Sequence, residues 1–292
     1  MTETVALFGA AGKIGTRISN RLRQTTAYHL LYVESGDTGI ARLRANGLEP
    51  TAPQQALAEA DIVVLAVPDR ILLAASAEVV PQAKSGALLV FLDPAVPVSG
   101  QLPARADVAY FVVHPCHPPV VTEETEREAI MDFYGGNKGK QSLVCALLQG
   151  DDTDYQTGEK LVSEMFAPIL RVHRITVEQM AILEPAMSET VVLTCMFVMK
   201  EAMEEAVRRG VPPAAALDFL MGHIKVNLGI QYGYLPGTQF SDGALRMVAR
   251  AKKQIFQPDW RKVFEPDNLA TQINEIIYGP DGEPGASKKT VL

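Results

Sequence analysis

Short runs of hydrophobic residues alternate with helical patterns over the first 176 residues. Several of the runs are continuously apolar, which is typical of strands in a mostly parallel sheet that helices cover on both faces. We therefore predict an α/β Rossmann domain over residues 1–176, with a doubly wound, mostly parallel sheet. The predicted strands are Thr4–Phe8, His29–Val33, Asp61–Val67, Ala87–Leu92, Ala109–Val113, Ser142–Leu148 and Ile169–Ile175.

The pattern changes at about residue 177, after which no strand pattern remains. We predict an all-α domain for substrate binding and dimerisation over residues 177–292, with a flexible tail from about residue 279. Pro185 lies inside the first helical pattern, where proline removes a backbone hydrogen bond, so we expect a kink or break there. The predicted helices are Gln179–Arg209, Ala214–Tyr232, Ser241–Phe256 and Pro266–Tyr278.

The composition is that of a globular protein. The chain has 292 residues, of which 47% are hydrophobic, enough for about two domains. Its 27 Lys and Arg against 34 Asp and Glu give a net charge of −7, which disfavours a nucleic-acid partner. The longest apolar stretch, near Val191–Met199, is far shorter than the roughly 20 residues of a membrane span. Three cysteines and no visible signal peptide favour a cytoplasmic protein.

A glycine-rich turn follows the first predicted strand, in the segment VALFGAAGKIGTR. A tight strand-to-helix turn lets the backbone approach a pyrophosphate and points a helix N-terminus at its negative charge. We therefore expect a dinucleotide to bind here; a glycine turn without a ligand is the alternative. The candidate contacts are Gly9, Gly12, Lys13, Ile14 and Gly15.

Two further strand ends favour the same cofactor. Glu34 ends the second strand, and an acid there accepts hydrogen bonds from the ribose 2′-OH and repels a 2′-phosphate, so NAD is favoured over NADP. The third strand runs into Val67, Pro68 and Asp69, which we expect to flank the cofactor. Asp69 has the alternative role of an N-cap for the next helix.

Two histidines lie at a stiff strand end, in the segment AYFVVHPCHPPVV. Three prolines fix the backbone around His114 and His117. Three roles are open for these histidines. They are general acids or bases, metal ligands together with Cys116 or a distant carboxylate, or structural side chains bonded to the backbone.

Glu184 directly precedes the helix proline, in a neighbourhood that is otherwise apolar. A carboxylate at such a position is either a structural cap or a functional group aimed into a cleft. We take Glu184 as a candidate site residue.

These motifs together resemble the 6-phosphogluconate dehydrogenase-like superfamily, which also includes ketol-acid reductoisomerases and prephenate dehydrogenases. The motifs are GAAGKIG after the first strand, DIVVLAVPD, the His-Pro strand end and the all-α second half. The combination of HPCHPP with ILEPAMSE is most similar to the D-apionate oxidoisomerase family, over the chain to about Phe264. The catalytic Lys of the β-hydroxyacid dehydrogenase branch is absent from the corresponding helix, which offers Glu184 and Glu189 instead.

The resemblance implies an NAD-dependent oxidoisomerase of sugar-acid catabolism that acts on D-apionate. Hydride leaves C2 for NAD, and an α-ketol rearrangement then moves a hydroxymethyl group from C3 to C2, which gives 3-oxo-isoapionate. Such chemistry needs a base and a Lewis acid or strong hydrogen-bond donors for the oxyanion. We expect His114, His117 and Glu184 to be catalytic, with a divalent metal held by His114 and Glu184.

Two other functions stay open at this point: a plain NAD-dependent hydroxy-acid dehydrogenase without rearrangement, and an NAD-sensing protein without turnover. The resemblance also implies a homodimer, because the all-α half of this superfamily commonly forms the dimer interface. The apolar helix around Val191–Met203 would fit that role.

Overall fold

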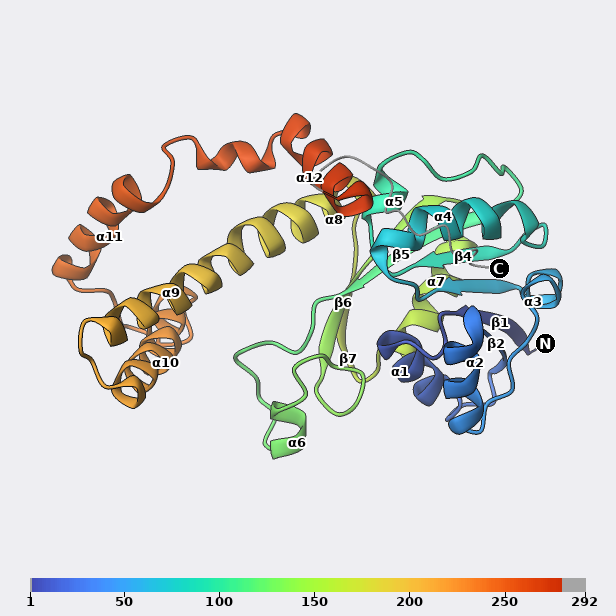
Figure 1. Ribbon diagram of the computed structural model, residues 1–292, viewed down its shortest axis with the longest axis horizontal. Coiled ribbons are helices and arrows are strands. Elements are labelled where there is room, and N and C mark those ends of the chain that lie inside the picture. The colour runs from blue at the N-terminus through green and yellow to red at the C-terminus, as the bar shows by residue number, and fades with distance from the viewer. Residues whose placement is uncertain (1, 280–292) are drawn as a thin grey trace. The chain divides into compact units, whose positions relative to one another are not determined.

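Seven strands form one sheet in the computed structural model, which describes residues 2–279 (Figure 1). Their order across the sheet is β2-β1-β3-β4-β5-β6-β7. Strands β1 to β5 pair in parallel, whereas β6 runs antiparallel to β5 and parallel to β7. The predicted mostly parallel Rossmann fold is confirmed. The strands are β1 (Glu3–Phe8), β2 (Tyr28–Val33), β3 (Ile62–Leu65), β4 (Leu88–Phe91), β5 (Ala109–Pro115), β6 (Gln141–Gln149) and β7 (Ile169–Arg174).

Each face of the sheet carries its own hydrophobic core. Side chains alternate along a strand, so in β1 Ala6 and Phe8 enter one core while Val5 and Leu7 enter the other. Helices α1 (Lys13–Leu22) and α7 (Asp152–Met165) contribute to the core of Val5. The core of Ala6 is covered by α3 (Pro53–Glu59), α4 (Asp69–Val79) and α5 (Ala95–Val98). Two further helices of this part of the chain are α2 (Gly36–Ala45) and α6 (Arg127–Ile130).

All regular structure between residues 177 and 279 is helical, as predicted. The helices are α8 (Val177–Ala181), a π-helical segment (Ile182–Leu193), α9 (Thr194–Arg208), α10 (Pro213–Gln231), α11 (Asp242–Ile255), a short 3-10 helix (Trp260–Phe264) and α12 (Pro266–Tyr278).

The helical path continues through Pro185, where a kink or break was expected. Residues Ile182–Leu193 adopt the wider π-helix, in which hydrogen bonds join residues five apart. A wider turn accommodates a residue that has no N–H to donate. The path from Val177 to Arg208 is therefore one helix of 32 residues.

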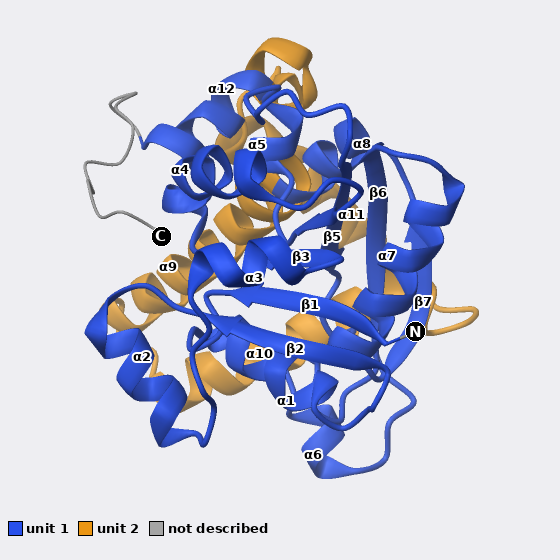
Figure 2. Ribbon diagram, turned by 90° about the vertical axis from the view of Figure 1, so that its right-hand side faces the viewer, with its two compact units in different colours: residues 1–184, 270–292 blue, residues 185–269 orange. Residues whose placement is uncertain are grey.

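The chain divides into two compact units (Figure 2). The first comprises Met1–Glu184 and Ala270–Leu292, and the second comprises Pro185–Leu269. This division falls later than the boundary expected after residue 176, because α8 contributes Val177 and Met180 to a core of the sheet. Helix α12 also returns to the first unit, whose core buries Ile273 and Ile277. The tail predicted from about residue 279 lies, beyond Gly279, outside the described residues.

By length and composition alone, the helix Val177–Arg208 is able to cross a membrane, unlike the shorter run considered in the sequence. Its most apolar window of 18 residues has a mean hydropathy of 1.5, and 11% of that window is buried. A helix that packs against another protein surface meets the same criterion. The helix therefore marks a large apolar surface that is uncovered in a single chain.

The contact between Gly158 of α7 and the buried ring of Phe111 in β5 gives a test of the packing. A Cβ atom at position 158 would lie 2.5 Å from the ring. We expect Gly158→Ala to lower the free energy of unfolding by about 1–3 kcal/mol through overpacking, although alanine gains about 1 kcal/mol in helix propensity. Urea titration measures this value.

The matched control is Gly222→Ala in α10, where no atom lies within 4 Å of an added Cβ. This variant gains the helix propensity without the clash, so its stability should be unchanged or higher. Equal stability of the two variants would contradict the packing of α7 on β5.

Candidate functional site

The glycine turn joins β1 to α1 by a very close approach of backbone segments. Gly9 has a φ of +76°, and a Cβ atom on it would overlap the carbonyl oxygen of Ala66 after β3. A Cβ atom on Gly15 would overlap the carbonyl oxygen of Gly9. Gly12 is the N-cap of α1 and offers bare backbone at the helix N-terminus. The turn therefore has the geometry that admits a pyrophosphate.

Glu34 points back at this turn from the end of β2. Its Oε1 atom accepts a hydrogen bond from the backbone N–H of Ala11, and its carboxylate lies against Gly39 of α2. The carboxylate is thus fixed beside the turn as an acceptor. An acceptor in this position suits the hydroxyl groups of a ribose.

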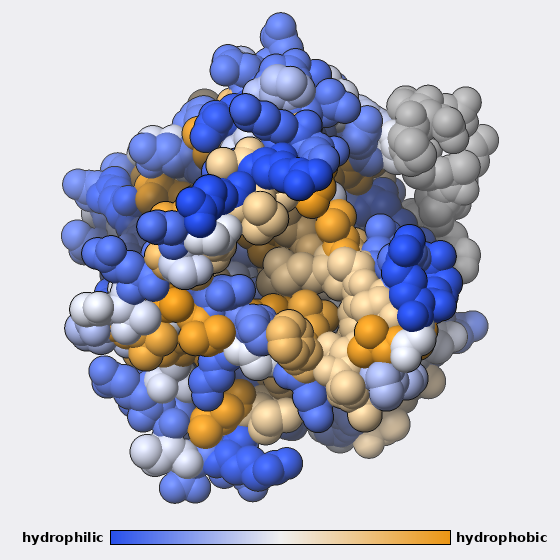
Figure 3. Space-filling view, turned by 90° about the vertical axis from the view of Figure 1, so that its left-hand side faces the viewer, coloured by the Kyte–Doolittle hydropathy of each residue, from blue (hydrophilic) through white to orange (hydrophobic). Residues whose placement is uncertain are grey.

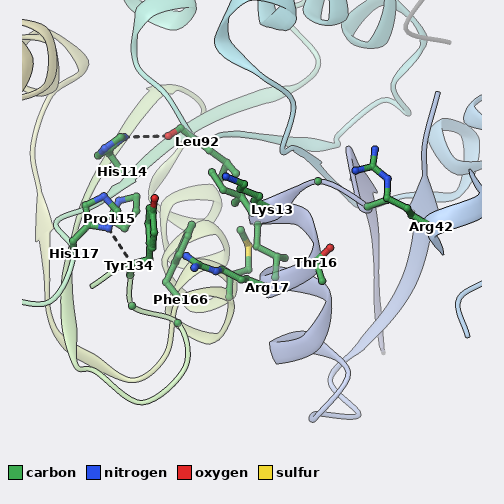
Figure 4. A pocket seen from close by; sticks show the side chains of 17 residues that line it. Lys13, Thr16, Arg17, Arg42, Leu92, His114, Pro115, His117, Tyr134 and Phe166 are labelled. Atoms are coloured by element: carbon green, nitrogen blue, oxygen red, sulfur yellow. Dashed lines mark hydrogen bonds between the residues drawn. The ribbon is translucent and has the colours of Figure 1, made fainter. Parts of the chain in front are cut away.

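Two cavities meet at the turn. The smaller, of about 180 Å³, is lined by Glu34, Val67 and Pro68 together with the glycines of the turn. The larger, of about 840 Å³, extends from Lys13 and Ile14 of α1 to His114 and His117 (Figure 4). Gly12 lines both, so one ligand can pass over the helix N-terminus from one cavity to the other. The residues present fit a nicotinamide dinucleotide.

Of the two roles considered for Asp69, the N-cap of the next helix is wrong, and contact with the cofactor stays a prediction. Asp69 is the first residue of α4, whose N-cap is Pro68, and no side-chain hydrogen bond caps this helix. Unlike Val67 and Pro68, it does not line the smaller cavity. Burial raises the pKa of Asp69, and the charge of His114 opposes this shift. Its carboxylate therefore belongs electrostatically to the surroundings of His114.

His114 and Glu184 are brought together by the fold. His114 is the next-to-last residue of β5, and Glu184 lies in the π-helical segment. The His114 Nε2 and Glu184 Oε2 atoms are 3.1 Å apart. The two side chains are 22% and 20% exposed, so they are partly shielded but reachable. The sequence separates them by 70 positions, and only the sheet places them in contact.

The hydrogen bond of Nδ1 determines which tautomer the neutral ring of His114 adopts. Nδ1 lies 3.2 Å from the carbonyl oxygen of Leu92, which can only accept, so Nδ1 carries a hydrogen and donates it. A neutral ring then has a bare lone pair at Nε2, facing a carboxylate. The contact becomes a hydrogen bond when one proton lies between Nε2 and Oε2. The pair is therefore built to hold and release a proton.

His117 is held in a strained conformation at the wall of the larger cavity. Its φ is +59°, a region that residues other than glycine rarely adopt. Its Nδ1–H donates to the carbonyl oxygen of Tyr134 at 3.0 Å, which leaves Nε2 for a ligand. The rings of His114 and His117 are 6.4 Å apart between centroids, so His117 neighbours the His114–Glu184 pair without bonding to it.

Asp93 was not among the residues expected in the site. It follows β4, and its Oδ1 atom accepts a hydrogen bond from the N–H of Ala95 at 2.7 Å. Burial, together with the charges of Asp69 and Glu184, raises the pKa of Asp93 to about 6, while His114 opposes the shift. As the pH rises, the carboxyl of Asp93 therefore stays protonated until the solution is only mildly acidic. The signal in the sequence was an acid at the carboxyl end of a buried strand.

Cys116 does not complete a metal site with the histidines. Burial and the charge of Glu184 raise the pKa of its thiol, which disfavours the thiolate. Between residues 2 and 279, no group of three or more His, Cys, Asp or Glu side chains is arranged to hold a metal ion. His114 and Glu184 remain a pair of donors with adjacent ligand atoms.

Two family models match the chain. Residues 1–145 match the acetohydroxy acid isomeroreductase NADPH-binding domain. Residues 122–277 match the phosphogluconate dehydrogenase (decarboxylating) C-terminal domain. The matches together span both compact units and agree with a dinucleotide-binding enzyme fold.

Whole-length relatives agree with these matches. The chain is 43% identical to the D-apionate oxidoisomerase of Cupriavidus necator over 94% of its own length and 100% of that protein. It is 42% identical to the D-apionate oxidoisomerase of Rhizobium rhizogenes over 93% of its length and 98% of that protein. A crystal structure from Cupriavidus necator, of a semialdehyde dehydrogenase NAD-binding protein in complex with calcium and NAD, has a TM-score of 0.91 and 43% identity, covering 94% of this chain and 100% of that one.

The raised pKa of Asp93 has a consequence for stability. Between about pH 4 and pH 6 the folded protein keeps a proton that the unfolded chain has lost, so the free energy of unfolding falls as the pH rises. Asp93→Asn removes this effect and keeps an oxygen for the Ala95 N–H. Relative to the wild type, the variant should gain on the order of 2 kcal/mol between pH 4 and pH 7.

Urea titration at both pH values, with a chelator present, measures this difference. Asp61→Asn is the control of opposite sign, because the hydrogen bond from Lys84 lowers the pKa of Asp61. That variant should lose stability relative to the wild type as the pH rises. A pH-independent difference between Asp93→Asn and the wild type would show that the pKa of Asp93 is the same in the folded and the unfolded protein.

Proposed function

Because the chain belongs to the D-apionate oxidoisomerase family, with the phosphogluconate dehydrogenase-type C-terminal domain over residues 122–277, we propose that it is an NAD-dependent oxidoisomerase of D-apionate. The family resemblance drawn from HPCHPP and ILEPAMSE is thereby confirmed. The observation that carries the function is the contact of Glu184 with His114, whose side chain lines the larger cavity. The pair would accept a proton beside the nicotinamide of a dinucleotide in this cavity.

NAD, when bound, supplies the hydride acceptor for C2 of the substrate. Glu34 favours NAD because its carboxylate accepts ribose hydroxyls and repels a 2′-phosphate. A relative of 43% identity was crystallised with NAD, which supports the same preference. Gly9, Gly12, Lys13, Ile14 and Gly15 form the turn beneath the pyrophosphate, and Val67 and Pro68 flank the ribose side.

His114 is the proposed base for the C2 hydroxyl. Nε2 takes the hydroxyl proton as hydride leaves C2, and Glu184 stabilises the imidazolium that forms. The carbonyl of Leu92 keeps the ring oriented, because Nδ1–H stays bonded to it in both protonation states. Oxidation thus produces a 2-oxo acid beside the tertiary alcohol at C3.

The same pair serves the rearrangement. The hydroxymethyl group migrates from C3 to C2. The C3 hydroxyl loses its proton and becomes a carbonyl, and the C2 oxygen gains a proton and becomes a hydroxyl. The His114–Glu184 pair could accept the proton from the C3 hydroxyl and deliver a proton to the C2 oxygen. His117 would donate from its Nε2 to the developing oxyanion only as an imidazolium, because its Nδ1–H is already bonded to the carbonyl oxygen of Tyr134.

In the alternative role of this pair, His114 and Glu184 would hold a divalent cation in place of the shared proton, because the single lone pair of Nε2 cannot bind a metal and accept a proton at once. Their ligand atoms are adjacent, and imidazole with carboxylate is a common donor set for catalytic metals. A cation there would act as a Lewis acid toward the substrate oxygens. The relative crystallised with calcium and NAD supports this proposal.

A second copy of the chain is the proposed cover for the apolar helix. In α9 no residue is buried, and its Met196 and Phe197 are 47% and 60% exposed. Leu193, which directly precedes α9, is 50% exposed. Hydrophobic side chains gather at the surface drawn in Figure 3. An exposed apolar face of this extent marks an interface. All three cysteines are free, and a cytoplasmic location stays a prediction.

Replacement of Glu184 by Gln tests the proton-accepting pair. The amide cannot take up the proton or stabilise an imidazolium, so we expect kcat to fall by about 10²–10⁴-fold. NAD affinity should stay unchanged, because Glu184 lines neither cavity. The measurement is NADH formation from D-apionate, with the carbon skeleton of the product determined by NMR.

Glu178→Gln in α8 is the control, since this acid bonds to Thr176 outside the site. Near wild-type turnover of Glu184→Gln would exclude the proposed role of Glu184. A product with the unchanged skeleton would identify a plain dehydrogenase. Activity that is lost with a chelator and restored by a divalent cation would support the metal, and turnover that survives chelation would exclude it.

Phe197→Glu tests the dimer. A charge at the centre of an apolar interface lacks a partner, so the variant should sediment as a monomer where the wild type sediments as a dimer. Leu170→Glu on β7, at a residue 43% exposed, is the control and should remain dimeric. A wild-type chain that is monomeric at micromolar concentration, or that partitions into membranes, would contradict the proposed interface.

A further inference from the structure

The larger cavity carries positive charge and no negative charge. Its lining includes Lys13, Arg17 and Arg42, and it includes no Asp or Glu side chain. The chain as a whole has a net charge of −7, so this sign is a local property of the cavity. A cavity lined by one sign of charge attracts ligands of the opposite sign. This lining favours anionic ligands.

Arg17 is the cation that the proposed function leaves unassigned. It lies one turn beyond Lys13 on α1 and is half-buried. Its guanidinium stacks over the ring of Tyr134, with 4.6 Å between Cζ and the ring centroid (Figure 4). In the part of the chain that the structure describes, no carboxylate forms an ion pair with it. The hydrogen-bonding edge of the guanidinium is therefore open to a ligand.

The ring that orients Arg17 is itself fixed. Tyr134 belongs to the loop between β5 and β6, and Asp132 braces this loop by accepting hydrogen bonds from four backbone N–H groups. The donors are those of Gly135, Asn137, Lys138 and Gly139. The carbonyl of Tyr134 also holds His117. The loop thus positions Arg17 and His117 along one wall.

A row of rings leads from the proposed base to Arg17. The centroids of His114 and His117 are 6.4 Å apart, and those of His117 and Tyr134 are 6.1 Å apart. Arg17 stacks on the last ring of this row. A substrate that reaches His114 with its hydroxyl therefore lies along a wall that ends in a guanidinium.

In a complex of the enzyme with NAD and a sugar acid, the negative charges of both ligands would need positive partners in this cavity. In the proposed NAD complex the two phosphates would meet the N-terminus of α1 and Lys13, and Arg42 also lines the smaller cavity beside Glu34. The third anionic group of the complex is the carboxylate of the sugar acid. A guanidinium matches a carboxylate in a planar, two-point contact.

We propose that Arg17 binds the substrate carboxylate and makes the enzyme specific for sugar acids over neutral sugars. This assignment rests on the proposed function, since it presumes a sugar acid as substrate. Arg17 takes no part in proton or hydride transfer. By fixing the carboxylate, it sets which carbinol of the substrate faces His114.

The test is Arg17→Gln, assayed with D-apionate and with its uncharged amide. A lost charge-assisted contact raises the KM for D-apionate by about 10–100-fold, while the KM for NAD changes by less than about threefold. The wild type should prefer the acid over the amide, and the variant should lose this preference. A role that only supports the loop would not change the preference. Arg17→Lys should restore part of it.

Arg21→Gln is the matched control, because it removes the same charge from the same helix outside the cavity. A raised KM for NAD in Arg17→Gln, with the acid preference kept, would overturn the proposal in favour of a phosphate contact. If all variants preferred D-apionate over its amide as strongly as the wild type does, the proposal would be overturned in favour of a structural role for Arg17. Both glutamine variants are first checked for wild-type melting temperatures, and Arg17→Lys carries the test if Arg17→Gln fails to fold.

Direct binding separates this proposal from the proposed reaction. Calorimetry of D-apionate against the NADH-loaded protein needs no turnover. Weaker binding to Arg17→Gln than to the wild type supports the role of Arg17 even in a protein that leaves D-apionate unchanged. Binding of equal strength overturns it, whether or not the reaction occurs.

Discussion

The register of the parallel strands determines where every group of the site lies. Phe8, Leu65, Phe91 and Val112 are direct neighbours across β1, β3, β4 and β5. The segments that follow these residues are therefore brought to one edge of the sheet, however far apart they are in the sequence. They supply the glycine turn, the Ala66–Asp69 loop, Asp93 and His114. A shift of register in any one strand would separate these groups by several ångströms.

The electrostatics at this edge follow from the same crowding. Glu184 contacts the imidazole of His114, whose charge also acts on Asp69 and Asp93, and burial raises the pKa of both aspartates. The backbone carbonyl of Leu92 determines which ring nitrogen of His114 faces that acidic environment. Chemistry at the substrate hydroxyl thus depends on a backbone group that takes no part in it.

Most of the fold was predictable because it is encoded locally. Continuous apolar runs identified all seven strands, and the glycine spacing identified the turn. The π-helical segment was not predictable, because proline in a helical pattern signals a break by its missing N–H, and the sequence does not show how neighbouring turns compensate. The separate histidine and glutamate candidates were found, but their contact depends on strand register. Asp93 and Arg17 were missed because a lone acid or arginine is ordinary until the fold encloses it. The roles of all these residues stay predictions.

The π-helical segment also affects how this chain is compared with more distant relatives. Each residue in a π-turn advances the helix by a smaller angle than in an α-helix, so side chains after Ile182 rotate progressively away from the positions an α-helix would give them. An alignment that matches letters without gaps would then pair residues on different faces of the two helices. The lysine of related dehydrogenases and Glu184 would be judged equivalent or unrelated according to where a single gap is placed. Divergence of chemistry within such a superfamily can therefore begin with an insertion that rotates a helix, before any catalytic residue is exchanged.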